Sequence, residues 1–291
     1  MCRSALPILA LLGLLAVQGS AQIPVYDGPE PTAIRQYGDG PLQFGELRIP
    51  DGVGPFPVAV TIHGGCWLDR LGEGSITPAA AALTEAGIAT WNVEYRRLGH
   101  QGGGWPGTFL DVGGGIDHLR VLAAEYPIDL TRVVLVGHSS GAHLAVWAAG
   151  RLGLPPESEI RGNSPLPVRA AVGIDGPMDL AAWSETGADV EVCGDTVISS
   201  LMGGSADDHP TRYRHASPAE MPPIDAAILL NPGEMMLSLG RPEVMTRRAR
   251  TTGETVTVRP VRNSNHFQLI TPSEEAWSIV LETIQAALGV G

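Results

Sequence analysis

Three segments of the sequence carry residue types suited to nucleophilic acyl transfer. Residues 63–67 read His-Gly-Gly-Cys-Trp, residues 137–141 read Gly-His-Ser-Ser-Gly, and His266 lies near the C-terminus. In this chain order they fit an anion-binding backbone loop, a serine on a sharp strand-to-helix turn, and a histidine general base. The pattern predicts a site in which Ser139 attacks a carbonyl carbon and His266 moves the proton.

The flanks of Ser139 make the motif more specific than a chance Gly-x-Ser-x-Gly match. A buried type of strand at 132–136 leads into the motif, and an alanine-rich helix at 141–152 follows it. The motif glycines leave room for a strained turn that a Cβ would crowd, and Ser139 would lie at a helix N-terminus, which favours a developing oxyanion. We interpret His138 as a packed neighbour and not as a catalytic group.

The glycine pair at 64–65 directly follows a predicted strand at 57–62. Glycines at such a position can turn backbone N–H groups toward the oxygen of a tetrahedral intermediate. We predict that the amides of Gly65, Cys66 and Ser140 form this oxyanion hole. The alternative is that the glycine pair only makes a turn.

Strand and helix patterns alternate along the chain, which is typical of an α/β protein with a largely parallel sheet. Residues 177–223 lose this periodicity and collect Gly, Pro and Asp, so we interpret them as a cap or long insertion over the site. The predicted strands are 43–49, 57–62, 88–94, 132–136, 168–174, 226–230 and 255–261, and the predicted helices are 78–85, 108–125, 141–152, 242–251 and 272–288.

Together these motifs resemble the α/β-hydrolase family, in the branch whose loop reads His-Gly-Gly-x-Trp, shared by carboxylesterase-like and kynurenine formamidase-like enzymes. Residues 92–96 (Asn-Val-Glu-Tyr-Arg), 104–106 (Gly-Trp-Pro) and 139–145 also agree with that branch. The resemblance implies the α/β-hydrolase fold: a mostly parallel, eight-stranded sheet with helices on both faces and a cap insertion. It also implies no cofactor and the chain order nucleophile, acid, histidine, with His266 matching the family's histidine. Our first hypothesis is an exported hydrolase that acts on small esters.

The acid of this triad is missing from its usual place. Where the family typically has an aspartate after the strand near 226–230, this chain has Met236, whose thioether cannot orient an imidazole. Glu234, on the same loop, is our first substitute, and Asp175, after the preceding strand, is the second. If neither reaches His266, the chain would be a hydrolase-like binding protein with little or no activity.

The N-terminus has the pattern of a secretory signal. Arg3 precedes an uncharged apolar run at 5–17, and small residues at 19–21 follow it, so we expect cleavage after Ala21 and a single hydrolase domain at 22–291. The mature chain has no apolar stretch long enough to span a membrane, and we expect it to be secreted or periplasmic. In such a compartment Cys66 and Cys193 could form a disulfide, or they could be two buried free thiols.

Composition removes several other classes of protein. The formal net charge of -12 argues against a nucleic acid or an anionic membrane surface as partner. All 19 basic residues are arginine, which excludes Schiff-base chemistry, a Ser-Lys dyad and a phosphate-loop lysine. The histidines and cysteines show no metal-binding spacing.

Overall fold

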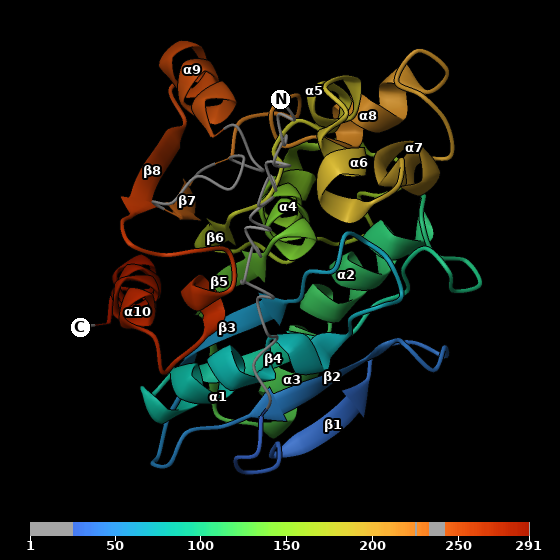
Figure 1. Ribbon diagram of the computed structural model, residues 1–291. Coiled ribbons are helices and arrows are strands. Elements are labelled where there is room, and N and C mark those ends of the chain that lie inside the picture. The colour runs from blue at the N-terminus through green and yellow to red at the C-terminus, as the bar shows by residue number, and fades with distance from the viewer. Residues whose placement is uncertain (1–25, 225, 233–241, 291) are drawn as a thin grey trace, which may run out of the picture.

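One eight-stranded sheet forms the centre of the protein. The computed structural model describes residues 26–224, 226–232 and 242–290. The strands run in the spatial order β1-β2-β4-β3-β5-β6-β7-β8 (Figure 1). The pairs β1–β2 and β2–β4 are antiparallel, and every neighbouring pair from β4 to β8 is parallel. This confirms the expected mostly parallel sheet. The strands are β1 (Ala33–Gln36), β2 (Phe44–Arg48), β3 (Phe56–Ile62), β4 (Ala89–Val93), β5 (Ile128–His138), β6 (Ala170–Ile174), β7 (Ala226–Pro232) and β8 (Thr255–Val261).

Helices cover both faces of the sheet. Val58, Val60 and Ile62 of β3 pack with the helices of one face, and Ala59 points to the helices of the other. Strands buried on both sides must be apolar at nearly every position, which explains their continuous apolar sequences. One face carries α2 (Gly107–Asp117), α3 (Leu119–Glu125) and α4 (Ser140–Gly150), and the other carries α1 (Thr77–Glu85) and α10 (Glu275–Leu288); α9 (Glu243–Thr252) packs beside β8.

Two predictions of secondary structure differ from the fold. The single helix expected at 108–125 is divided at His118 into α2 and α3, and the short strand β1 was not predicted. The glycines within α2 let the helix approach the sheet, since a Cβ on Gly115 would lie 2.7 Å from Val93. These glycines therefore favour close packing and do not interrupt α2.

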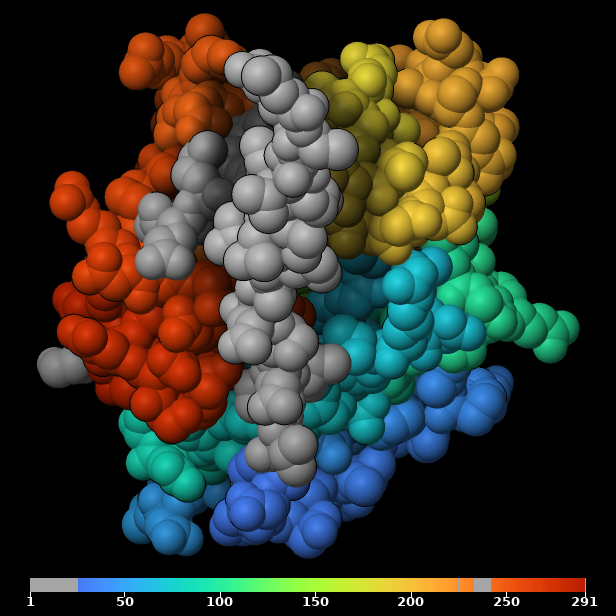
Figure 2. All heavy atoms as spheres, viewed as in Figure 1, coloured from blue at the N-terminus to red at the C-terminus, as the bar shows by residue number. Residues whose placement is uncertain are grey.

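Residues 177–223, which we call the insertion, lie between β6 and β7 and form four short helices. These are α5 (Leu180–Glu185), α6 (Ala188–Cys193), α7 (Val197–Met202) and α8 (Pro210–Ala216). The Asp179 side chain caps α5 by accepting from the Ala182 amide at 3.0 Å, and glycines in the left-handed conformation, Gly194 and Gly203, end α6 and α7. In Figure 2 the yellow insertion rests against the cyan segment that follows β3. Within the described ranges no helix combines the length and apolarity needed to cross a bilayer.

Candidate active site

Ser139 lies on a sharp turn between β5 and α4. Its φ of 58° and ψ of -125° are strained for a residue with a side chain, and its amide donates to the Ile174 carbonyl at 2.8 Å. The flanking glycines permit the turn, because a Cβ on Gly137 would lie 2.0 Å from the Gly141 oxygen. Ser139 is 9% exposed. The strand-turn-helix context expected from the sequence is thus present.

Asp175 and His266 meet beside this turn. His138 and Ile174 are paired across β5 and β6, so Ser139 and Asp175 leave neighbouring strands at the same edge of the sheet. His266 follows β8, and its Nδ1–H donates to Asp175 Oδ2 at 2.7 Å. The Asp175 side chain is only 1% exposed and that of His266 is 18% exposed. The carboxylate therefore fixes the imidazole so that Nε2 is the free nitrogen.

Asp175 was our second candidate for the acid. Glu234, the first, and Met236 both fall outside the described residues. Asp175 has a φ of 48°, and its amide donates to the Leu230 carbonyl at 2.9 Å, which fixes the backbone of the residue. Its other carboxylate oxygen, Oδ1, is buried and has no hydrogen-bond partner among the described residues. Within the described part of the chain, His266 is therefore the one hydrogen-bond partner of the Asp175 carboxylate.

His138 contacts the backbone of the loop that carries His266. Its Nε2–H donates to the His266 carbonyl at 2.9 Å, and the two rings lie 4.2 Å apart between centroids. Burial, and then the nearby His266, lower the pKa of His138 well below its ordinary value, so it stays a neutral donor. Sequence reasoning did not find this contact, because nothing local to the motif indicates which distant carbonyl His138 meets.

The segment after β3 lies directly on the Ser139 turn. A Cβ on Gly64 would lie 2.8 Å from the Ser139 Cβ and from the His138 carbonyl oxygen, so only glycine fits there. Among the described residues, the amides of Gly65, Cys66 and Ser140 make no hydrogen bond within the protein. These three amides were our predicted oxyanion donors, and no described residue accepts a hydrogen bond from them.

A tight turn sets the conformation of this segment. The Leu68 amide donates to the Gly65 carbonyl at 2.9 Å, and the two residues between them, Cys66 and Trp67, have φ values of 57° and 55°. Positive φ at both central positions is the type I′ pattern, which favours Gly, Asn and Asp. Each left-handed residue here costs on the order of 1–3 kcal/mol, so the surroundings must hold the turn.

A buried polar cluster supports the start of the segment. His63 is fully buried and donates from Nδ1 to the Gly64 carbonyl at 2.8 Å, and its Nε2 lies 3.2 Å from Glu94 Oε1 and 2.9 Å from an Arg97 nitrogen. Glu94 accepts from Arg97 and from the Tyr95 amide. Burial would raise the pKa of Glu94, but its bonds with His63 and its other partners outweigh burial and lower that pKa well below its usual range. The cluster therefore contains a buried ion pair, between Arg97 and Glu94, beside the first residue of the segment.

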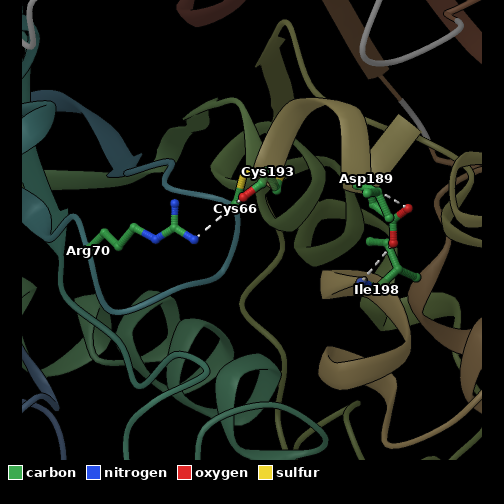
Figure 3. Close-up of a disulfide and its surroundings, with 6 residues drawn as sticks. Cys66, Arg70, Asp189, Cys193 and Ile198 are labelled. Carbon is green, nitrogen blue, oxygen red and sulfur yellow. Dashed lines mark hydrogen bonds between the residues drawn. A yellow bond between two sulfur atoms is a disulfide. The ribbon is translucent and has the colours of Figure 1, made fainter. Parts of the chain in front are cut away.

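A disulfide joins the same turn to the insertion (Figure 3). Cys66 and Cys193 are bonded through sulfur, with 5.9 Å between their Cα atoms and 127 positions between them in sequence. Of the two alternatives left open by the sequence, the structure has the bridge. Figure 3 also shows the Arg70 guanidinium reaching the Cys193 carbonyl, at 3.5 Å.

Comparison with known proteins identifies the class of the chain. It belongs to the BD-FAE family, a carboxylesterase-like family of α/β hydrolases, whose model matches residues 48–227. That match includes Ser139 and Asp175 and ends before His266. The protein is therefore an esterase-like hydrolase by family.

One curated relative matches part of this region. A probable isoprenylcysteine alpha-carbonyl methylesterase of Arabidopsis thaliana is 30% identical over 141 residues. The match covers 47% of this chain and 29% of the relative, so it spans less than a third of that protein's length.

Solved structures share the fold over nearly the whole chain. A truncated carbohydrate esterase from gut microbiota is 18% identical, with a TM-score of 0.73 over 89% of this chain and 97% of its own. An acetyl ester-xyloside bifunctional hydrolase of Caldicellulosiruptor lactoaceticus is 16% identical, with a TM-score of 0.69 over 90% and 98%. A propionate-bound esterase of Thermogutta terrifontis is 15% identical, with a TM-score of 0.69 over 88% and 93%. These likenesses support the α/β-hydrolase fold.

Proposed function

We propose that this protein is an exported serine esterase that cleaves small carboxylic esters through an acyl-enzyme on Ser139. The observation that carries the proposal is the 2.7 Å contact between His266 Nδ1 and Asp175 Oδ2, beside the strained turn that holds Ser139. Strained serine turns and imidazoles fixed by a buried carboxylate occur together where a hydroxyl must be activated.

In the proposed reaction, Ser139 is the nucleophile, His266 transfers the proton and Asp175 orients the imidazole. His266 Nε2 accepts the Ser139 proton as Oγ attacks the ester carbonyl, and Asp175 stabilises the imidazolium. The amides of Gly65, Cys66 and Ser140 donate to the oxyanion. The imidazolium then protonates the leaving alcohol. A water molecule, deprotonated by His266, releases the acid and restores the Ser139 hydroxyl.

We assign the orienting acid to Asp175 in place of Glu234. Support comes from the burial of Asp175 and from the strand pairing that brings it beside Ser139. Esters are favoured as substrates because the neighbours in fold include proteins named as carbohydrate, acetyl-ester and propionate-bound esterases. Export is supported by the signal pattern at residues 1–21 and by the disulfide, which fits an oxidising compartment.

Labelling with an alkyl fluorophosphonate tests the proposal. This reagent phosphonylates an activated serine, and peptide mapping locates the adduct. We expect the label on Ser139 in the wild type and in the control Ser278→Ala, which removes an exposed hydroxyl on α10, and no label in Ser139→Ala. A wild type that takes no label at Ser139 contradicts the proposal.

A further inference from the structure

The turn at 65–68 places two side-chain-bearing residues, Cys66 and Trp67, in a left-handed conformation. A strained conformation of this kind persists only where neighbouring structure holds it. Cys66 lies two residues after Gly64, which contacts the Ser139 turn, and its amide is one of the three that donate to no described residue. The contacts that keep Cys66 in this conformation therefore also set the direction of its N–H, a proposed oxyanion donor.

The two strained residues are held by different means. Trp67 is fully buried, and its ring packs edge-on against His143 and Trp183, with centroids 5.4 and 6.1 Å away. Its carbonyl also accepts from the Leu98 amide at 2.8 Å. Cys66 is only partly buried, and its side chain is anchored by the bond to Cys193.

The far end of this bond is itself fixed. Cys193 is the last residue of α6 and is 4% exposed. Within α6 the carboxylate of Asp189 is buried and accepts from the Ile198 amide of α7 at 3.4 Å, which links the two helices (Figure 3). The disulfide therefore ties Cys66 to a packed helix and not to an exposed loop.

We propose that the Cys66–Cys193 disulfide is a positioning element for acyl transfer: it holds the Cys66 amide in the direction that an oxyanion donor requires. This inference rests on the proposed function at Ser139. The bond acts through the Cys66 backbone and touches no reacting atom. A donor that serves the tetrahedral intermediate contributes to kcat more than to ground-state binding, so opening the bond should lower kcat and leave KM nearly unchanged.

The experiment opens the bond in the folded wild type and then closes it again. A water-soluble phosphine reduces the disulfide to two thiols and becomes a phosphine oxide, with water supplying the oxygen and both protons. Diiodomethane then joins the two thiols through one methylene group, releasing two equivalents of hydrogen iodide. For each form, kcat and KM are measured with p-nitrophenyl acetate, affinity is measured for a boronic acid that forms a tetrahedral adduct on serine, and folding is followed by circular dichroism.

We expect reduction to lower kcat about 10- to 100-fold, to weaken boronic acid binding in parallel, and to change KM less than about threefold. The methylene bridge should restore most of the lost kcat. The double variant Cys66→Ser/Cys193→Ser should match the reduced wild type and show no response to phosphine. If this variant does not fold, the reduced and re-bridged wild type alone decides the question.

Two results would overturn the inference. One is a folded, reduced protein with unchanged kcat. The other is a loss of activity that only follows the unfolded fraction, since the bond would then be a stabilising cross-link alone. A wild type with its bond intact but no label on Ser139 would instead contradict the proposed function, so the two failures are distinguishable.

Discussion

Asp175 Oδ2 lies 2.7 Å from His266 Nδ1, although the two residues are 91 positions apart in the sequence. The contact depends on the order of strands in the sheet. Because β6 lies next to β5, Asp175, which follows β6, lies at the same edge of the sheet as Ser139, which follows β5. The acid that we propose for this site therefore follows β6, where the family pattern places it after β7.

Replacing Asp175 should show its role as the orienting acid. In Asp175→Asn the imidazole loses its charged partner and can adopt the wrong tautomer, so we expect kcat for p-nitrophenyl acetate to fall about 10³- to 10⁴-fold. Glu234→Gln is the matched control and should keep activity near that of the wild type. The assignment is wrong if Glu234→Gln loses activity and Asp175→Asn does not.

Gly64 should tolerate no side chain. The Cβ of Gly64→Ala would lie 2.8 Å from the Ser139 Cβ, so the loop must move away from the serine. We expect kcat to fall about 100-fold or more, a loss of the size seen when an oxyanion donor is removed. Gly74→Ala is the control, because a Cβ there meets nothing within 4 Å. Equal kcat in both variants would show that the loop does not serve the reaction.

His138 should act on His266 through the backbone. His138→Phe keeps a ring against His266 but removes the donor to its carbonyl, so we expect kcat to fall about tenfold with KM little changed. His138→Gln, which can still donate, should recover part of this loss, and the shape of the pH–rate profile should stay the same in both. Loss of the acidic limb of that profile in His138→Phe would mean that His138 itself carries the proton.

His143 should make stability depend on pH. Burial, partly offset by donation from Nε2 to the Ala216 carbonyl, lowers its pKa from 6.5 to about 4. As pH falls from 6.5 toward 4 the unfolded chain binds a proton that the folded chain does not, so the free energy of unfolding decreases over this range, by up to about 3 kcal/mol.

The test compares urea unfolding of the wild type and of His143→Gln, whose amide can still donate to Ala216. The variant should lose less stability between neutral pH and pH 4 than the wild type does. The same loss in both proteins would show that another group is responsible.

The sequence predicted the parts of the fold that have long, clear periodicity. The strand at 255–261 has its predicted bounds, and the strand and helix around Ser139 lie within four residues of theirs, because alternating or apolar strand patterns and the motif glycines are local signals. The helices of the insertion were not predicted, since α5, α6 and α7 have six residues each and give too few turns to show a period.

The site was predictable where its chemistry is local and not where it depends on topology. The residue types and order around Ser139 and His266 indicate the reaction. The choice between Glu234 and Asp175 depends on which strand lies beside β5, and the contact of His138 depends on where the loop after β8 returns. Neither is encoded within a window of neighbouring residues.

Trapping the acyl-enzyme tests the central claim most directly. The protein is mixed with p-nitrophenyl acetate, quenched in acid after a few milliseconds to seconds, digested, and analysed by mass spectrometry. The account predicts an acetyl group on Ser139 in the wild type, strongly reduced acetylation in His266→Ala, and none at this position in Ser139→Ala. Release of p-nitrophenol without acetyl on Ser139, or equal acetylation in His266→Ala, would contradict it.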